Sequence, residues 1–293
     1  MPARSYFQIF SSLAVSLILL LSGCRRSAPL LPDHPRLASG VAMKDVTFHS
    51  AALGRDMPYR VLLPETVAPG SKLAVVYLLH GNGGSYRDWS NYSDVARYAA
   101  NGLILVMPEG GSSYYMNAVE RPRDKYEDYL VHDLVQDVEA RFPARADRAN
   151  RALIGVSMGG FAAVKIGLSY PDRFVFAGAI SPAIDVPERR FTWMRASQYR
   201  RFQTIFGPWG SAERQARDPF VLVRSVDGKA LPYFYVTAGE QEPLLEPVRR
   251  FGTALKLRGI AYEFHTKPGG HDWGEWDAQI PGCFAALLQH LTR

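Results

Sequence analysis

The sequence predicts an α/β fold, in which a mostly parallel central sheet carries helices on both faces. Short, continuously apolar runs recur along the chain, and apolar residues at helical spacing lie between them. Continuous apolar runs are typical of strands that are covered on both faces, as in a parallel sheet. Strand–helix alternation of this length predicts the covering helices. The 293 residues, of which 47% are hydrophobic, suffice for a sizeable core.

The first 23 residues differ from the rest. Arg4 is the only charged residue before an apolar stretch that ends in the sequence LSGC, at Cys24. This is the layout of a signal peptide, and it is short for a membrane-spanning helix. The ending resembles the lipobox of bacterial lipoproteins, which implies cleavage before Cys24 and attachment of lipid to that residue. An ordinary secretory signal or an uncleaved anchor is the alternative. We expect a lipid-anchored protein of the cell envelope that faces the periplasm or the exterior.

Residues 24–40 follow as a predicted extended tether, because they contain three prolines and no apolar periodicity. Residues 41–293 then form the folded domain. Cys24 and Cys283 are the only two cysteines, so lipidation of Cys24 leaves no pair for an intramolecular disulfide, and Cys283 is expected to be buried. The net charge of +6 is spread along the chain without a long basic run, which gives no support to a nucleic-acid ligand.

The elements of the domain can be placed in order. Residues 46–49 and 59–63 are expected to form an opening antiparallel pair. Further strands are predicted at residues 73–79, 103–107, 152–156, 174–180 and 233–238, with helices at 131–142, 244–255 and 284–291. Residues 182–231 are longer than a normal connection and contain several aromatic residues. Long insertions in compact domains are often functional, and we interpret this one as a cap over the carboxyl ends of the strands.

A G-x-S-x-G sequence, GVSMG at residues 155–159, joins a predicted strand to a predicted helix. This is the context of a nucleophile elbow, a sharp turn that exposes a serine oxygen. Flanking glycines leave room for such a strained turn. Glycine-rich strand–helix turns also occur without catalysis, but the strand and helix on either side favour Ser157 as a nucleophile.

A serine hydroxyl needs a base, and on this type of turn the acid and the histidine follow the serine in chain order. The histidines downstream are His265, His271 and His290. His290 falls late in the final helix, and His265 belongs to a predicted edge strand. His271 lies in the glycine-rich loop KPGGHDW, which can deliver its side chain to the strand ends. We therefore predict that His271 is the base.

The acid should follow the strand at 233–238. Its carboxylate would hold the imidazole in one tautomer and stabilise the imidazolium. Glu240, Glu242 and Glu246 are the candidates, and spacing alone does not choose among them. Asp272 is adjacent to His271 in the chain, a position from which two side chains rarely interact productively.

A second glycine-rich stretch, HGNGG at residues 80–84, follows the strand at 73–79. Its backbone can turn an N–H group towards the serine and complete an oxyanion hole with the N–H of Met158. A plain turn is the alternative. Because His80 lies upstream of the serine, we interpret it as structural.

Taken together, LLHGNGGSYRDW, GVSMGGFAAV, AGEQEPLLEPVRRF and PGGHDWGEW, spread over residues 75–276, resemble an esterase branch of the α/β hydrolases. That branch includes S-formylglutathione hydrolases, tributyrin, feruloyl and acetylxylan esterases, and antigen 85 mycolyltransferases. The resemblance implies the α/β-hydrolase fold, Ser157 as nucleophile, His271 as base, and oxyanion N–H groups at Asn82 and Met158. The family acid is usually an aspartate three residues after the glycine that ends the strand, a position that Glu242 occupies here.

These features predict a serine carboxylesterase that acts on a small-molecule or glycan ester through an acyl-enzyme. No cofactor and no metal are expected, since HExxH and paired Cys/His spacings are absent. Acyl transfer to a sugar or lipid alcohol is the first alternative, and a catalytically silent envelope-binding protein is another. A serine peptidase is disfavoured because the chain has no room for a propeller domain. The aromatic residues of the insertion, with Tyr114, Tyr115 and Trp273, either line a substrate pocket or pack as core.

Overall fold

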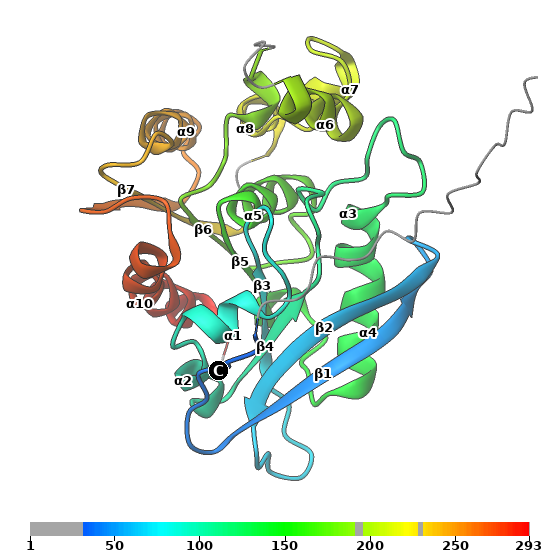
Figure 1. Cartoon of the computed structure of the whole chain (residues 1–293). Coiled ribbons are helices and arrows are strands. Elements are labelled where there is room, and N and C mark those ends of the chain that lie inside the picture. The colour runs from blue at the N-terminus through cyan, green and yellow to red at the C-terminus, as the bar shows by residue number, and fades with distance from the viewer. Residues whose placement is uncertain (1–31, 191–195, 228–230, 293) are drawn as a thin grey trace, which may run out of the picture. The chain divides into compact units, whose positions relative to one another are not determined.

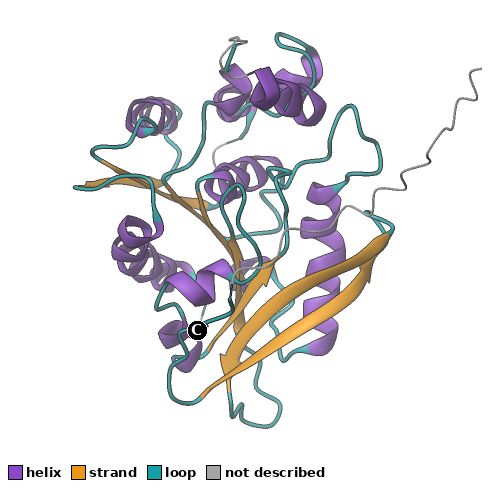
Figure 2. Ribbon diagram, viewed as in Figure 1, coloured by secondary structure: helices purple, strands orange, loops and turns teal. Residues whose placement is uncertain are grey.

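An eight-stranded sheet runs through the part of the chain that the computed structural model describes, residues 32–190, 196–227 and 231–292 (Figure 1, Figure 2). The signal peptide and Cys24 lie outside these residues, and so does the first part of the tether. The strands are β1 (Val41–Ser50), β2 (Arg55–Pro64), β3 (Ala74–Leu79), β4 (Leu103–Pro108), β5 (Arg151–Val156), β6 (Phe176–Ile180), β7 (Tyr233–Gly239) and β8 (Tyr262–Lys267).

The strand order is β1-β2-β4-β3-β5-β6-β7-β8. β1 and β2 form the expected antiparallel pair, and β2 runs antiparallel to β4, whereas all pairs from β4 to β8 are parallel. Every residue of β3, β4, β5 and β6 is buried. This confirms the mostly parallel sheet expected from continuous apolar runs. β8 is only half-buried and lies at the edge of the sheet, as predicted for the strand that contains His265.

Helices cover both faces of this sheet. One hydrophobic core lies under α4 (Val135–Arg141), α5 (Met158–Ser169) and α9 (Leu245–Leu257). The other lies under α1 (Asp88–Tyr92), α2 (Ala96–Ala100) and α10 (Trp273–His290), where Cys283 is fully buried. Burial raises the pKa of the Cys283 thiol well above its usual range. The prediction of a mostly parallel sheet with helices on both faces is therefore confirmed.

The helix expected at residues 131–142 has a different start. The chain enters it through a short α3 (Tyr126–Asp128) and a π-helical segment, η1 (Tyr129–Leu134), before α4 begins. The apolar stripe is buried as predicted, since Val131, Leu134 and Val138 have no exposed surface. The periodicity of apolar residues therefore predicted the buried face but not the change of winding from π-helix to α-helix.

The insertion predicted at residues 182–231 contains η3 (Val186–Glu188), α6 (Ala196–Phe206), α7 (Ala212–Gln215) and α8 (Pro219–Ser225). Phe191, Trp193 and Met194 lie outside the described residues. Two phenylalanines of α6, Phe202 and Phe206, pack as core against the ring of Tyr114. α8 contacts α5 and α9. Trp209, by contrast, is 48% exposed.

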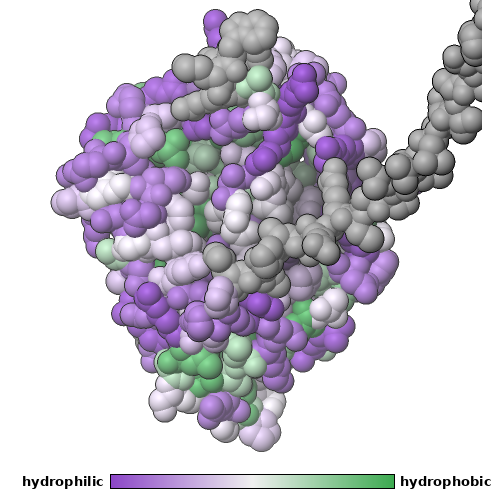
Figure 3. Space-filling model, viewed as in Figure 1, coloured by the Kyte–Doolittle hydropathy of each residue, from purple (hydrophilic) through white to green (hydrophobic). Residues whose placement is uncertain are grey.

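Large apolar side chains are exposed singly in the described residues, at Leu37, Trp209, Leu257 and Leu288. Figure 3 shows that the hydrophobic groups on the face in view form small patches within a mostly hydrophilic surface. No helix in residues 32–190, 196–227 or 231–292 has both the length and the apolar character needed to cross a bilayer.

Candidate active site

Ser157 lies at the sharp turn between β5 and α5, where the sequence placed a nucleophile elbow. Its backbone is left-handed, with φ 53° and ψ −110°, a conformation that is strained for a residue with a side chain. Three hydrogen bonds hold it: the N–H of Ser157 donates to the carbonyl of Ile180, and its own carbonyl accepts from the N–H groups of Phe161 and Ala183. The hydroxyl is thereby presented at the carboxyl end of the central strand.

The glycines beside Ser157 are required by close packing. A Cβ atom added at Gly155 would overlap the backbone of Gly159, and one added at Gly159 would overlap the carbonyl of Leu79 in β3. Because these neighbours are backbone atoms, they cannot move aside without shifting a strand. The G-x-S-x-G spacing therefore lets α5 begin directly against the sheet.

We expect Gly159→Ala to destabilise the protein by about 3 kcal/mol or more, the upper part of the range for overpacking, measured by urea unfolding. Gly252→Ala is the matched control. It lies within α9, where an added Cβ would meet no atom closer than 3.6 Å. Alanine favours a helix over glycine by about 1 kcal/mol, so the control should be neutral or stabilising. Equal stability of the two variants would contradict the packing argument.

A chain of two hydrogen bonds links three side chains at the ends of β5, β7 and β8. Ser157 Oγ lies 2.9 Å from His271 Nε2, and His271 Nδ1 lies 2.6 Å from Glu242 Oε2. A carboxylate accepts only, so Nδ1 carries the proton and Nε2 is free to accept from the serine hydroxyl. The ring of Trp276 packs against the imidazole of His271 in a T-shaped contact, with the ring centroids 5.0 Å apart. This arrangement lets an imidazole take the proton of a hydroxyl.

Glu242 is held in place at both carboxylate oxygens. Its side chain is fully buried, and the oxygen that does not face His271 accepts a hydrogen bond of 2.9 Å from the N–H of Gly239. A Cβ at Gly239 would overlap the carbonyl of Gly269, so the loop that carries His271 packs directly on the end of β7. The extra methylene of glutamate is accommodated because the side chain turns back onto the strand from which it came.

The other candidate acids lie elsewhere. Glu240 accepts a hydrogen bond from Thr266, and the exposed Glu246 lies 3.8 Å from Arg249. Asp272 caps the N-terminus of α10, where its side chain accepts from the N–H groups of Gly274 and Glu275. Of the candidates that spacing left open, the structure brings only Glu242 to His271.

The remaining histidines downstream of Ser157 also have other contacts. His265 Nε2 lies 2.7 Å from a carboxylate oxygen of Glu263, on the edge strand. His290 stacks on the ring of Tyr233, with ring centroids 3.9 Å apart. Neither is hydrogen-bonded to the serine.

The loop after β3 brings Asn82 beside the serine. A Cβ added to its neighbour Gly81 would lie 3.6 Å from the Cβ of Ser157. Within the described residues, the backbone N–H groups of Asn82 and Met158 donate no hydrogen bond to the protein. Met158 is the first residue of α5, where N–H groups have no partner in the helix. These two donors are therefore available to a ligand oxygen.

His80 orients one of these donors. The sequence predicted a structural role for His80 but not this one. His80 is 1% exposed. Its Nε2 accepts from the N–H of Gly110 at 3.0 Å, so its Nδ1 carries the proton and donates to the carbonyl of Gly81 at 2.8 Å. The Gly81 carbonyl and the Asn82 N–H belong to one planar trans peptide. Fixing the carbonyl therefore fixes the direction of the N–H.

Two cavities meet at Ser157, His271 and Asn82. One, of about 430 Å³, is lined by the glycines at 81, 83 and 84 and by Asp88, Tyr92, Trp273 and Trp276. The other, of about 480 Å³, is lined by Tyr114, Ala183, Asp185, Arg189, Gln198, Pro243 and Leu244. Burial raises the pKa of the Asp88 carboxyl, and His80 and Ser85 partly offset this rise.

The sequence left open whether Tyr114, Tyr115 and Trp273 line a pocket or pack as core, and the structure shows both. Trp273 and Tyr114 line the two cavities, whereas Tyr115 is fully buried and packs as core. Among the residues described, no cluster of three or more histidine, cysteine or acidic side chains is arranged to hold a metal ion.

The sequence is related to known esterases. The model of the family described as "Putative esterase" matches residues 50–287. An acetyl esterase from Caldicellulosiruptor saccharolyticus is 25% identical over 262 residues, which is 83% of this chain and 97% of that protein. Esterase Rv1288 from Mycobacterium tuberculosis is 30% identical over 252 residues, which is 76% of this chain but only 54% of the relative.

Solved structures show the same fold. FphF, a fluorophosphonate-binding serine hydrolase of Staphylococcus aureus, superposes with a TM-score of 0.73 at 24% identity, over 84% of this chain and 98% of that one. An S-formylglutathione hydrolase from Agrobacterium tumefaciens gives a TM-score of 0.77 at 21% identity, over 88% and 99% of the two chains. Because the family model spans most of its length, the chain belongs to this esterase family of α/β hydrolases and is a carboxylic ester hydrolase.

Proposed function

We propose that the protein is a serine carboxylesterase that works through an acyl-enzyme, with Ser157 as nucleophile, His271 as general base and acid, and Glu242 as the residue that orients His271. The observation that carries the proposal is the continuous pair of hydrogen bonds from Ser157 Oγ through the imidazole to the buried carboxylate.

The reaction proceeds in two halves. As Ser157 Oγ attacks the ester carbonyl, its proton passes to Nε2 of His271, and Glu242 stabilises the imidazolium. The tetrahedral intermediate collapses when Nε2 returns this proton to the leaving alcohol, which leaves the acyl group on the serine. A water molecule then gives a proton to Nε2 and attacks the acyl carbonyl. The second tetrahedral intermediate collapses when Nε2 passes this proton to Ser157 Oγ, which releases the acid and restores the free serine.

The negative charge of both intermediates is accepted by the N–H groups of Asn82 and Met158. These donors are fixed before substrate binds, one by His80 and the other by the start of α5. Preorganised donors of this kind avoid reorganisation in the transition state, and each typically contributes about 10²–10³ in rate.

The substrate is a carboxylic ester of a small molecule or a glycan, with its acyl and alcohol parts in the two cavities that meet at Ser157. Hydrolysis of p-nitrophenyl esters from acetate upwards, measured with and without added sugar or lipid alcohols, tests this proposal. We expect free acid to be the main product at every alcohol concentration. An acyl group found mainly on the added alcohol would identify a transferase instead, and failure of the protein to turn over any ester would support the silent binding protein.

We further propose that lipid on Cys24 anchors the enzyme to the cell envelope. Each buried methylene of a lipid chain adds about 0.8 kcal/mol of membrane affinity, and stable anchoring takes more than one chain. We expect Cys24→Ala to abolish incorporation of labelled palmitate and to move the protein into the aqueous phase of a Triton X-114 extraction. Ester hydrolysis per molecule should stay unchanged. Unaltered labelling and partitioning would contradict the anchor.

A further inference from the structure

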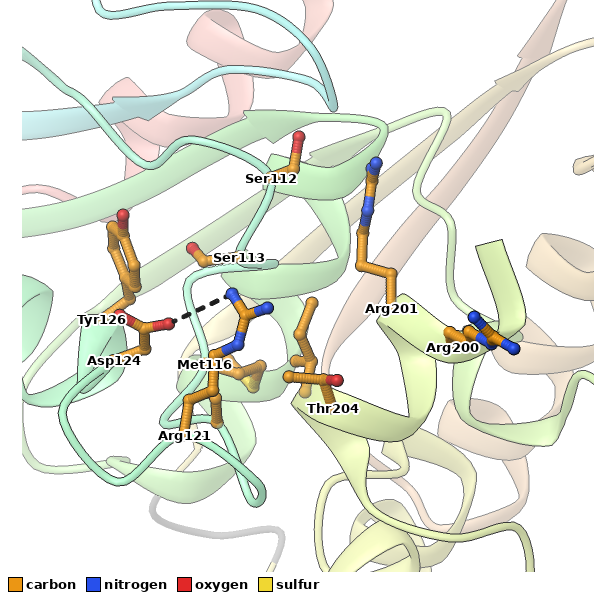
Figure 4. Close-up of a pocket in the computed structure, with 11 residues that line it drawn as sticks. Ser112, Ser113, Met116, Arg121, Asp124, Tyr126, Arg200, Arg201 and Thr204 are labelled. Carbon is orange, nitrogen blue, oxygen red and sulfur yellow. Dashed lines mark ion pairs between the residues drawn. The ribbon is translucent and has the colours of Figure 1, made fainter. Parts of the chain in front are cut away.

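A third cavity lies beside the proposed active site and contains none of its residues. Its volume is about 540 Å³. One wall comes from the loop between β4 and α3 and the other from α6 (Figure 4). It is lined by Ser112, Ser113, Met116, Ala118, Arg121, Asp124, Tyr126, Arg200, Arg201, Thr204 and Ile205. We refer to it below as the arginine cavity.

The arginine cavity is positively charged. Its lining contains three arginines and one aspartate, and because Arg200 is turned away (Figure 4), the side chains that face the cavity carry a formal excess of one positive charge. The aspartate, Asp124, is already shared, because it lies 3.8 Å from Arg121 and 3.8 Å from Arg55, which is outside the lining. The cavity therefore offers positive charge that its own carboxylate does not neutralise.

One arginine connects this cavity to the active site. Arg201 lines the arginine cavity, and its Nη1 donates a hydrogen bond of 3.1 Å to the side-chain oxygen of Asn82. Asn82 in turn lines both cavities that contain Ser157. Arg201 therefore joins the lining of the arginine cavity to a residue that lines both cavities at Ser157.

The loop after β4 contributes residues both to the arginine cavity and to one of the cavities at Ser157. Ser112 and Ser113 face the arginine cavity, whereas the next residue, Tyr114, lines the cavity at Ser157. Tyr114 and Tyr115 both have left-handed backbones, with φ of 57° and 53°. Such strain in bulky residues persists only where the surroundings enforce it, and it clusters at ligand sites.

We propose that the arginine cavity binds an anionic group, a carboxylate or a phosphate, carried by the ester substrate at a distance from the scissile bond. This inference rests on the proposed esterase function and specifies its substrate class. Arg121 and Arg201 supply the charged donors, because the planar guanidinium pairs well with both kinds of anion. Figure 4 shows Arg201 reaching from α6 towards the loop of Ser112, whereas Arg200 is turned away.

The test compares pairs of esters of which one member carries an added carboxylate. The p-nitrophenyl monoesters of succinic, glutaric and adipic acid carry an anion on the acyl part, and p-nitrophenyl esters of unbranched monocarboxylic acids of matching length are their neutral partners. 4-Acetoxybenzoate against phenyl acetate places the anion on the alcohol part. The measured quantity is the ratio of kcat/KM for the anionic ester to that for its neutral partner.

Arg121→Gln is expected to lower this ratio about five- to tenfold in one of the two series, the size expected for a solvent-exposed hydrogen bond to a charged group. The series that responds tells which part of the substrate carries the anion. The matched control is Arg123→Gln, which removes the same charge from the same loop outside the cavity lining and should leave the ratio within twofold. Arg201→Gln should lower the ratio too and, because Arg201 also holds Asn82, should slow the neutral esters as well.

An unchanged ratio in both series for Arg121→Gln, or an equal fall for Arg123→Gln, overturns the inference while the esterase function stands. Failure of the parent protein to hydrolyse any ester would overturn the proposed function instead. Binding of free glutarate or inorganic phosphate, measured by calorimetry, then still tests the cavity. Binding that weakens in Arg121→Gln and not in Arg123→Gln supports the inference, and binding that is absent or the same in both overturns it.

Discussion

Replacing Ser157 by alanine is expected to lower kcat for ester hydrolysis about 10⁶-fold, and replacing His271 by alanine should cost about as much. The two side chains act as one unit, because the serine hydroxyl is a poor nucleophile without the base, and the base has nothing to activate without the serine. The double variant is therefore expected to be no slower than either single variant. Purified proteins assayed with p-nitrophenyl acetate at high enzyme concentration provide the measurement.

Stability provides the control for these variants. The Ser157 side chain does not belong to the hydrophobic core, so the thermal midpoint of Ser157→Ala should match that of the parent within a few degrees. His271→Ala leaves the buried carboxylate of Glu242 without one of its two partners, which lowers the thermal midpoint, so the two variants that carry it are assayed well below their own midpoints. A double variant whose loss equals the product of the two single losses would contradict the account, since it would mean that Ser157 and His271 act independently.

Glu242→Gln is expected to lower kcat about 10⁴-fold, the size seen when the acid of a serine triad is replaced by its amide. The carboxylate keeps the proton of His271 on Nδ1, and an amide that donates towards Nδ1 would move this proton to Nε2, where it blocks transfer from the serine. KM should change little, because Glu242 lines neither of the cavities at Ser157.

Two further substitutions complete this comparison. Glu240→Gln is the matched control, because it makes the same chemical change two residues away at a side chain that contacts Thr266, and it should keep kcat within twofold. Glu242→Asp should be faster than Glu242→Gln, since it keeps a carboxylate, yet slower than the parent because the shorter chain cannot reach both Gly239 and His271. A fully active Glu242→Gln would move the role of the acid to another residue.

The sheet could be predicted from the sequence because strands that are buried on both faces consist of continuous apolar runs. Gly155 and Gly159, which flank Ser157, likewise indicate the close packing of α5 on the sheet, because a side chain at either position would overlap backbone atoms. His271 could be singled out because it lies in a glycine-rich loop that directly follows the last strand. Such a loop lies at the carboxyl ends of the strands, where the serine is also found.

The choice of acid could not be made from spacing, because it depends on contact between loops that are far apart in the sequence. Gly239 packs on Gly269 in the loop that carries His271, and Glu242 bonds both to Gly239 and to the imidazole. The link from Arg201 to Asn82 spans 119 positions and has no local signal at either end. The role of His80 likewise depends on Gly110, which comes from another strand end.

The central claim is that Ser157 is an activated nucleophile, and labelling with a fluorophosphonate tests it most directly. The reagent bonds covalently to a serine only when a base removes the hydroxyl proton as the bond forms. We predict a stoichiometric adduct that maps by peptide mass spectrometry to Ser157 and that is lost in Ser157→Ala and His271→Ala. An adduct at another residue, or equal labelling of the parent and Ser157→Ala, would contradict the account.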